Sequence, residues 1–347
     1  MASGIAERKA TTSKGGADAC PARWTIKALR IAAIALALGT LAWSLAWLLP
    51  ARVWQVDLLA ELSMHGAMVA AAATVLGAIA RSRAALTISA ASLFAFAACF
   101  ASVPRLPHAP ATSTDTLRVL AFNARAPDRD PLLVLDDIAK VGADLVCLTE
   151  PNAKLARAVR AGRLAERDPG LSHQGWRHWV RHENPAQVVV SRWPLQREEV
   201  EHPDLGGEGI MALRVRAPSG DFGVVMMHPE SATTPFRWRK AFEETAAARM
   251  AAEQLEARGL RTIIVGDGNT TPVGPRSRLL AREGWLRAKP IGPGSTFPSW
   301  LPEVAGVAID DLWARRDVRI GSWRVLESFG SDHRAVEIRV ELPRTAP

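Results

Sequence analysis

The chain contains 347 residues, of which 48% are hydrophobic and 22% are charged. This length exceeds that of one average domain, and this hydrophobic content excludes an intrinsically disordered protein. The formal net charge of +8 is unevenly distributed: residues 1–108 hold 10 Lys and Arg against 4 Asp and Glu, whereas residues 109–347 hold 33 against 31. The basic excess therefore belongs mainly to the N-terminal third and is poor evidence for a nucleic-acid-binding domain.

The three cysteines, Cys20, Cys99 and Cys147, lie in three different kinds of segment, and no two have the spacing of a metal-binding pair. The sequence therefore excludes a disulfide framework and a zinc knuckle as organising features. It contains 12 tryptophans and no tyrosine, so no phenol is available as a catalytic proton donor.

Three long apolar runs dominate the N-terminal third. Residues 31–50 and 84–104 carry no charged side chain, and residues 62–80 carry His65 as their one ionisable group. Each run is about 20 residues long, which at about 1.5 Å per residue suffices to cross a hydrocarbon core of about 30 Å. Tryptophans, which favour membrane interfaces, lie near both ends of the first run: Trp24, Trp43, Trp47 and Trp54. These features predict three transmembrane helices.

Basic residues predict the orientation of these helices. Six Lys and Arg residues precede the first run and two lie between the second and third, whereas Arg52 alone lies between the first and second. The positive-inside rule then places the N terminus in the cytoplasm and everything after residue 104 outside. The first run could instead be a signal peptide, but it is longer than a typical signal core and two further runs follow. We therefore expect a cytoplasmic tail at residues 1–26, a membrane anchor at 27–104 and an extended linker at 105–116.

Residues 117–343 have the pattern of one α/β domain. Short apolar runs predict strands at residues 117–122, 143–149, 187–191, 210–215, 222–227, 261–266, 307–313 and 335–342. A helix is predicted over residues 235–258, because Thr234 is a good cap, Pro235 suits the first helical position and Gly259 ends the pattern. Shorter helices are expected near residues 131–141, 151–163 and 275–283. A domain of this length can bury a well-filled core.

Polar residues follow six of the apolar runs, where the expected strands end. They are Asn123, Glu150, His228, Asp267 with Asn269 two residues further on, Asp310, and the pair Asp332 and His333. Each residue alone has an ordinary structural explanation, since Asn, Asp and Gly favour turns and a single His at a strand end is usually hydrogen-bonded. Together they indicate a functional site, because the ends of neighbouring strands can converge on one cleft.

These residues stand in ordered sequence motifs: LAFNAR, LVCLTEP, VVVSRWPL, VVMMHPES, IIVGDGNTTP, VAIDDLW and FGSDHRAV. In this order the motifs resemble those of the endonuclease/exonuclease/phosphatase superfamily, over residues 117–342. The G-D-x-N and S-D-H motifs, about 65 residues apart, are specific in combination. The resemblance implies an α/β fold, a four-layer sandwich of two β-sheets flanked by helices and preceded here by three transmembrane helices. The resemblance is strongest to the membrane-anchored bacterial members of the superfamily. This implies an integral protein of the bacterial cytoplasmic membrane.

The resemblance also implies a metal site. It makes Glu150 the principal ligand, and Asn123 and Asp332 supply further oxygen ligands. Oxygen ligands suit Mg²⁺ or Mn²⁺, which bind few protein groups and keep water and phosphate oxygens in their coordination shell. A metal in this place acts as a Lewis acid and as a template for the phosphate ester.

The remaining polar residues are implied to be catalytic. Asp267 orients or deprotonates the attacking water, and Asn269 holds a phosphate oxygen. His333, paired with Asp310, stabilises the phosphate as an imidazolium or acts as an acid/base, because a neighbouring carboxylate raises the pKa of a histidine. His228 is a second acid or a contact of the leaving group. This chemistry requires no nucleophilic Ser or Cys.

Two positions depart from the pattern of the superfamily. Gly268 replaces a large apolar residue, which we expect to loosen the strand end, and Asp311 adds a carboxylate near the site. Neither departure removes a residue with a role in the family. Cys147 lies inside an apolar strand and is expected to be a core residue.

We therefore expect a membrane-anchored, metal-dependent phosphoesterase with its domain outside the cytoplasm. The domain lacks the basic excess that tight binding of a polyanion uses, and the anchor raises the effective concentration of membrane substrates. These points favour a phosphorylated lipid or lipid-linked phosphate as the substrate. The alternatives are an extracytoplasmic nuclease acting on nucleic acid and a catalytically silent binding module on the same fold. No specific protein partner is inferred.

Overall fold

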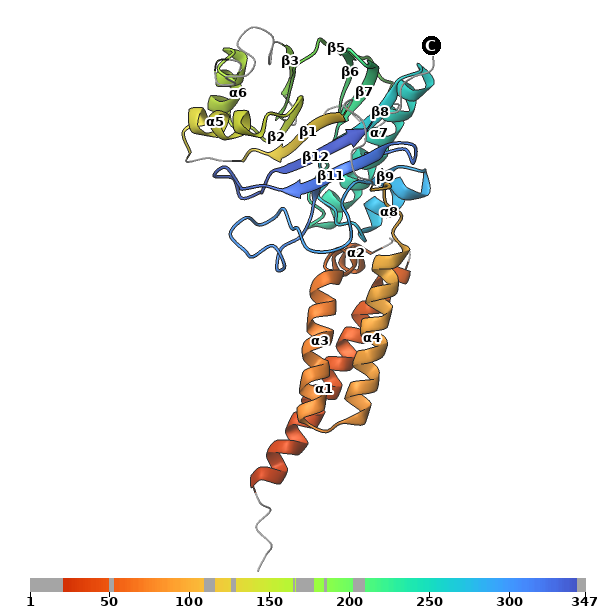
Figure 1. The fold of residues 1–347 in the computed structure, drawn as a ribbon. Coiled ribbons are helices and arrows are strands. Elements are labelled where there is room, and N and C mark those ends of the chain that lie inside the picture. The colour runs from red at the N-terminus through yellow and green to blue at the C-terminus, as the bar shows by residue number, and fades with distance from the viewer. Residues whose placement is uncertain are drawn as a thin grey trace, which may run out of the picture.

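A helical bundle and a two-sheet α/β domain follow one another in the computed structural model (Figure 1). The described residues are 21–49, 53–108, 116–125, 129–164, 166, 178–183, 186–201 and 210–341. Most of the expected cytoplasmic tail lies outside them, and the first helix already includes the last residues of that tail.

Four α-helices and one short 3₁₀ turn form the bundle. They are α1 (Pro21–Leu45), the 3₁₀ turn η1 (Ala46–Leu48), α2 (Trp54–Glu61), α3 (Ser63–Ile79) and α4 (Arg83–Ser102). Helices α1 and α4 are each long and apolar enough to cross a membrane, whereas α2 and α3 meet this condition only as a pair bent by 68°. By length and composition, the described residues thus contain two membrane-spanning candidates, or three if the bent pair counts as one.

Small residues fill the inside of the bundle, and large apolar residues cover its outside. Fully buried small residues come from all three long helices, namely Ala33, Ala37, Ala70, Ala73 and Ala85. By contrast, Phe94, Ile79 and Val75 are 77%, 67% and 61% exposed. A Cβ atom on Gly66 would lie only 2.4 Å from the ring of Phe96, so the helices approach closely at that glycine. Helices pack in this way in membranes, because lipid solvates large apolar side chains as well as a protein core does.

The segment that follows α4 packs against the α/β domain instead of forming a free linker. Leu106 is buried among the core residues of the two sheets, and its N–H donates to the carbonyl of Arg287 at 2.9 Å. Nε2 of His108 donates to the carbonyl of Ala288 at 2.7 Å. The chain is therefore attached to the domain as far as His108, and the rest of the expected linker, residues 109–115, lies outside the described residues.

Two six-stranded sheets form the centre of the domain. The first sheet has the order β11 (Arg319–Val325), β12 (Val336–Glu341), β1 (Thr116–Asn123), β2 (Leu145–Thr149), β4 (Ala186–Ser191) and β3 (His178–Glu183). The second sheet has the order β5 (Leu195–Arg197), β6 (Met211–Ala217), β7 (Gly220–Met226), β8 (Arg261–Asp267), β10 (Asp310–Ala314) and β9 (Leu286–Arg287). Both sheets are mixed, since β1 pairs parallel with β2 and β7 pairs parallel with β8.

Helices cover the outer face of each sheet. Helices α5 (Pro131–Val141) and α6 (Ala153–Arg160) pack on the first sheet, and α7 (Pro235–Ala257) and α8 (Pro275–Arg282) pack on the second. The inward-facing side chains of the two sheets form one core, which includes Val119, Cys147, Val224, Val265 and Ile338. This arrangement confirms the four-layer sandwich that the sequence motifs imply.

The eight expected strands and the four expected helices of the domain are all present, with shifted ends. Helix α7 begins as predicted, with the Thr234 side chain accepting the N–H of Arg237 at 3.3 Å and Pro235 at the first position. The four strands that the sequence pattern missed, β3, β5, β9 and β11, are the edge strands of the two sheets. Strands at a sheet edge are partly solvated and lack the continuous apolar runs of central strands.

The short helix α2 lies across the domain end of the bundle (Figure 1) and contacts the α/β domain. Nε1 of Trp238, near the start of α7, donates to the carboxylate of Asp57. Beside this contact, Nε2 of His65 donates to the carbonyl of Ala305 at 2.8 Å. His65, the one ionisable residue of the second apolar run, therefore lies at the domain rather than within an apolar layer.

Glu61, the last residue of α2, binds the loop that follows β8. One carboxylate oxygen accepts the hydroxyl of Thr270 at 2.6 Å, and the other accepts the N–H of Thr271. The same carboxylate lies 3.6 Å from the guanidinium of Arg276, whose side chain is only 2% exposed. A buried charge needs a counter-charge, because desolvation without one costs several kcal/mol. Glu61 of the bundle thus supplies the counter-charge that Arg276 of the α/β domain requires.

We therefore expect Glu61→Ala to destabilise the α/β domain. Removing one partner of a buried ion pair costs on the order of 3 kcal/mol, which corresponds to a Tm lower by roughly 5–10 °C for a domain of this size. The measurement is thermal unfolding of the full-length protein in detergent, followed by tryptophan fluorescence. Glu243→Gln on the exposed face of α7 is the control. Equal Tm values for the two variants would show that the bundle contributes nothing to domain stability.

Candidate active site

The expected site residues meet at one end of the sandwich, where strands of both sheets end. From the first sheet, Asn123 ends β1, Glu150 follows β2, and Asp332 and His333 precede β12. From the second sheet, His228 follows β7, Asp267 ends β8 and Asp310 begins β10. Strands β8 and β10 pair so that Asp267 lies opposite Asp310. The sandwich therefore brings together residues that are up to 210 positions apart in the sequence, from Asn123 to His333.

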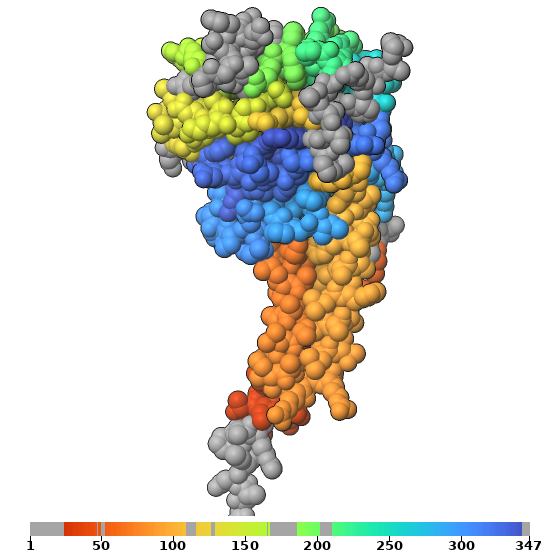
Figure 2. Space-filling model, in the orientation of Figure 1, coloured from red at the N-terminus to blue at the C-terminus, as the bar shows by residue number. Residues whose placement is uncertain are grey.

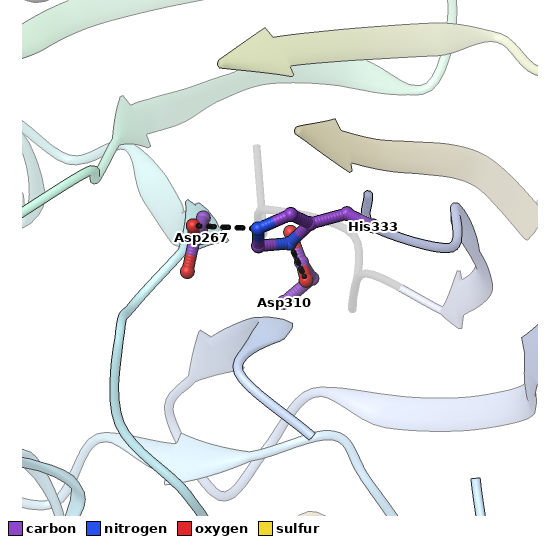
Figure 3. A group of neighbouring side chains, drawn as sticks. All are labelled: Asp267, Asp310 and His333. Atoms are coloured by element: carbon purple, nitrogen blue, oxygen red, sulfur yellow. Dashed lines mark hydrogen bonds and ion pairs between the residues drawn. The ribbon is translucent and has the colours of Figure 1, made fainter. Parts of the chain in front are cut away.

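A histidine between two carboxylates forms the buried part of the site (Figure 3). Nδ1 of His333 donates to Asp310 Oδ2 at 2.8 Å, and its Nε2 lies 3.8 Å from Asp267 Oδ2. Burial alone would lower the pKa of His333, but the carboxylates of Asp310 and Asp267 outweigh it and raise the pKa to about 9. The pairing of His333 with Asp310 that the sequence comparison implied is therefore present, and it favours the imidazolium form.

A second histidine binds the expected principal metal ligand. Nε2 of His228 lies 3.0 Å from Glu150 Oε1 and 3.7 Å from Asp267 Oδ2. The hydrogen bond from His228 lowers the pKa of Glu150 below its usual value. The backbone of Glu150 has a φ of 48°, a left-handed conformation that is uncommon outside glycine. Glu150 is thus an ionised carboxylate that an unusual backbone turn directs towards the site.

The two asparagines are held by specific hydrogen bonds. Nδ2 of Asn123 donates to Asp267 Oδ2 at 3.0 Å, which joins the first sheet to the second. The N–H of Asn269 donates to Asp267 Oδ1 at 2.8 Å, and its side-chain amide donates to the carbonyl of Pro229 at 2.9 Å. The guanidinium of Arg276 donates to the carbonyl of Asn269. The loop after β8 is therefore fixed on one side by Asp267 and on the other by Arg276, the partner of Glu61.

These side chains line an open cavity of about 440 Å³. Seven of the eight expected site residues form its walls, namely Asn123, Glu150, His228, Asp267, Asn269, Asp332 and His333. The eighth, Asp310, is fully buried behind His333. The residues that the sequence motifs indicated therefore lie together at this cavity.

The cavity is also lined by residues that were not predicted to have a role. They are Arg125, Pro229, Glu230, Ser231, Arg237, Lys240, Glu244, Phe297 and Ile309. Arg125 is 4.0 Å from Glu150, and the ring of Phe297 lies with its centre 4.8 Å from that of His333. Arg125 stands in LAFNAR, and several others stand in HPES or in the basic helix after it, so their motifs were the available signal. Phe297 is an apolar residue in a loop and gave no such signal.

Asp311 does not add a carboxylate to the site, which corrects the expectation from the sequence. Side chains alternate between the two faces of a strand, so Asp311 points away from its neighbour Asp310 and is fully buried. There its carboxylate accepts from the guanidinium of Arg287 and from Nε1 of Trp323, the latter at 2.9 Å. Asp311 therefore forms a structural ion pair with Arg287 of the neighbouring strand. It leaves the charge of the cavity unchanged.

Gly268 does not leave empty space at the strand end, which corrects a second expectation. A Cβ atom at this position would lie 2.7 Å from the ring of Trp313 and 3.3 Å from the methyl group of Met227. Trp313 is fully buried, so its indole fills the volume that a larger residue would occupy. The strand end is therefore packed from the neighbouring strand β10.

The donor set at the cavity fits a hard divalent cation. The carboxylates of Glu150, Asp267 and Asp332 face the cavity together with two histidines, and Glu230 and Glu244 also line it. Atoms of Asp267, Asp310 and His333 also lie within 4.8 Å of one another and could hold an ion, but Asp310 is enclosed and already bonded to His333. Because Mg²⁺ and Mn²⁺ retain water and phosphate oxygens as ligands, the open side at Glu150 suits them better.

Several solved structures are similar to part of this chain. An endonuclease/exonuclease/phosphatase from Beutenbergia cavernae is similar over 65% of this chain and 72% of its own, with 21% identity and a TM-score of 0.50. Truncated TDP2 from Caenorhabditis elegans covers 66% of this chain and 98% of its own at 14% identity and a TM-score of 0.49. Sphingomyelinase C from Streptomyces griseocarneus covers 65% and 99% at 19% identity and a TM-score of 0.44.

The likeness to the Beutenbergia cavernae structure shows the fold, and a search of curated proteins finds no match. The family is shown by a sequence model. The model described as the Endonuclease/Exonuclease/phosphatase family matches residues 119–333, which is more than half of the chain and includes every residue of the cavity named above. Its members are metal-dependent hydrolases of phosphate esters. The chain belongs to the endonuclease/exonuclease/phosphatase family.

Proposed function

We propose that this protein is a membrane-anchored, divalent-metal-dependent phosphoesterase that hydrolyses a phosphorylated lipid or lipid-linked phosphate at the outer face of the bacterial cytoplasmic membrane. The position of the cavity relative to the anchor carries this proposal. Arg237 and Asn269 line the cavity, and their chain neighbours Trp238 and Thr270 bind α2 of the bundle. The reacting groups therefore lie beside the end of the helices that would leave the bilayer.

The side chains on the outer surface of the bundle support its assignment as a membrane anchor. Its large apolar side chains face outwards and its small ones face inwards, which suits a lipid environment and is unfavourable in water. The basic residues Arg81 and Arg83 lie at the end of the bundle that is distant from the domain (Figure 1). The positive-inside rule then assigns that end to the cytoplasm and the α/β domain to the outside.

The charge of the cavity rim favours a small phosphate group over a long polyanion. Two basic residues that line the cavity, Lys240 and Arg237, both pair with Glu230, at 3.5 and 3.3 Å. Lys240 also lies 3.6 Å from Glu244. Because nucleases that follow a strand use several unpaired basic contacts, these pairs argue for the lipid substrate.

In the proposed mechanism, Glu150, Asn123 and Asp332 would hold Mg²⁺ or Mn²⁺. When bound there, the ion would supply positive charge to compensate for that of the phosphate oxygens. Asp267, in contact with both histidines, orients the attacking water and accepts its proton.

The other residues act on the phosphate and on the leaving oxygen. His333, held by Asp310 in the imidazolium form, donates from Nε2 to a phosphate oxygen, and Asn269 holds another. His228 is close to Glu150 and supplies the second acid at the leaving oxygen. General acid–base help of this kind contributes about 10²- to 10⁴-fold in rate.

The first expectation is that activity depends on the metal and on three residues. The full-length protein with Mg²⁺ or Mn²⁺ should hydrolyse a generic phosphate ester and lose activity in EDTA. Glu150→Gln, Asp267→Asn and His333→Ala should each lower kcat by at least about 100-fold, because each removes a preorganised charged group. Cys147→Ser is the control, since this buried core residue should affect stability without affecting turnover. Full activity in EDTA would contradict the metal assignment, and metal binding without turnover of any ester would favour a silent binding module.

The second expectation concerns the substrate. With Mg²⁺ and detergent micelles, kcat/KM should be higher for dioleoyl phosphatidic acid or a polyprenyl phosphate than for a single-stranded oligonucleotide. The physical reason is that the anchor holds the cavity beside micelle-bound substrates and raises their effective concentration. Faster turnover of the oligonucleotide, with a steep loss of that activity as salt is added, would identify the protein as a nuclease instead.

The third expectation concerns the side of the membrane. A reporter that is active only after export, fused after Pro347, should be active, and one that is active only in the cytoplasm should be silent there. The same two reporters fused after Ser82, in the turn between α3 and α4, should give the reverse result. Cytoplasmic activity at Pro347 would mean an even number of crossings, and the bent pair α2 and α3 would then not span.

A further inference from the structure

A second, mostly apolar cavity lies between the bundle and the α/β domain. It has a volume of about 550 Å³, within the range of about 300–1,000 Å³ that is usual for ligand sites. On the bundle side it is lined by Met64 and Met68 of α3 and by Leu93, Ala97 and Phe100 of α4. On the domain side it is lined by residues of the segments 271–273 and 289–308. None of its residues lines the catalytic cavity.

The cavity offers mainly apolar surface, and its charged lining residues are few. Glu61 is paired with Arg276, and Glu303 is exposed to solvent. The two basic side chains bond to backbone carbonyls: Arg105 donates to Val103 and Phe100 at 2.8 and 2.7 Å. The ammonium of Lys289 donates to the carbonyls of Gly292 and Pro293, both at 3.0 Å. A ligand in this cavity therefore gains binding free energy mainly by burying its apolar groups.

Exposed apolar side chains belong to the segment that forms the domain side of the cavity. Ile291 and Val304 line the cavity and are 69% and 59% exposed, and Trp300 in the same segment is 76% exposed. In Figure 2 this light-blue segment lies above the orange helices of the bundle. Large exposed apolar side chains mark a contact surface, and tryptophan in particular favours the headgroup layer of a membrane. The segment thus lies at the level where the apolar helices α3 and α4 would meet the membrane surface, which favours lipid as the occupant.

The two cavities share a wall. Phe297 and Ile309 line the catalytic cavity, whereas Ser295, Val307 and Ala308 line the apolar one. Within this wall, Phe297 and Val307 exchange two backbone hydrogen bonds of 2.9 and 2.7 Å. One pair of extended segments therefore separates the metal-ligand side of the domain from a cavity that opens to lipid.

We propose that the apolar cavity binds one hydrocarbon chain of the substrate lipid while its phosphate occupies the catalytic cavity. This inference rests on the proposed function and adds to it the part of the protein that selects long-chain lipids. Each methylene group removed from water contributes about fourfold in affinity. A chain of several buried carbons therefore separates a long-chain phosphate from a soluble one by orders of magnitude.

The test uses a variant whose apolar cavity is filled by a large side chain. It compares the hydrolysis of two phosphatidic acids that differ in acyl-chain length. Ala97→Trp places an indole in the cavity, and Ala91→Trp, on the same helix but outside the cavity lining, is the matched control. For the full-length protein in detergent, Ala97→Trp should lower kcat/KM for dioleoyl phosphatidic acid at least about tenfold and leave that for dibutyryl phosphatidic acid unchanged. Ala91→Trp should change neither value. An unchanged ratio of the two kcat/KM values in Ala97→Trp would overturn the inference.

Lipid binding without turnover provides the second readout. In EDTA, a phosphatidic acid with a photoreactive group in its chain should label the wild-type protein at Met64, Met68 or Ile291, and Ala97→Trp should remove this labelling. Even labelling over the outer surface of the bundle, including Phe94, would mean ordinary contact with surrounding lipid and would overturn the inference. If Ala97→Trp fails to fold, Ala67→Phe on α3 fills the same cavity.

The failure of this inference is distinguishable from that of the proposed function. Hydrolysis of both phosphatidic acids with no chain-length preference in the wild-type protein would retain the lipid phosphoesterase and reject the chain-binding cavity. Hydrolysis of oligonucleotides alone would reject both.

Discussion

The carboxylate of Asp267 holds the site together. It is 1% exposed at the meeting point of the two sheets and accepts hydrogen bonds from Asn123 of the first sheet and from the N–H of Asn269. Both histidines of the site approach it within 4 Å. A buried anion is stable only when such groups compensate for the water that it has lost. The need to compensate this buried anion therefore joins the two sheets at this end and also assembles the polar groups of the candidate site.

A chain of contacts extends from this centre to the helical bundle. Asn269 receives a hydrogen bond from Arg276, and the buried charge of Arg276 is balanced by Glu61 at the end of α2. The bundle therefore supplies the counter-charge for a loop that lines the candidate site. Leu106 and His108, in the segment after α4, form a separate contact between the bundle and the domain.

Two adjacent carboxylates, Asp310 and Asp311, have different roles in this fold. Asp310 and Asp311 are neighbours in the sequence, but the alternation of a strand sends them to opposite faces. Asp310 orients His333, whereas Asp311 is neutralised by Arg287 and takes no part in the site. The 295–309 segment likewise lies between two cavities, the polar one beside His333 and the apolar one beside α3 and α4.

The sequence by itself indicated the central strands and the four helices of the α/β domain, because buried runs are local patterns. For the same reason it indicated the three long apolar helices of the bundle and seven residues that line the polar cavity, but it did not indicate the short helix α2. It could not determine the edge strands, since these lack a continuous apolar run. The role of Asp311 and the filling of the space beside Gly268 by Trp313 also required the tertiary structure, because both depend on a neighbouring strand. The same is true of the pairing of Glu61 with Arg276 and of the apolar cavity, which join segments some 200 residues apart. Interactions between residues distant in the chain are set by packing, and no local pattern records them.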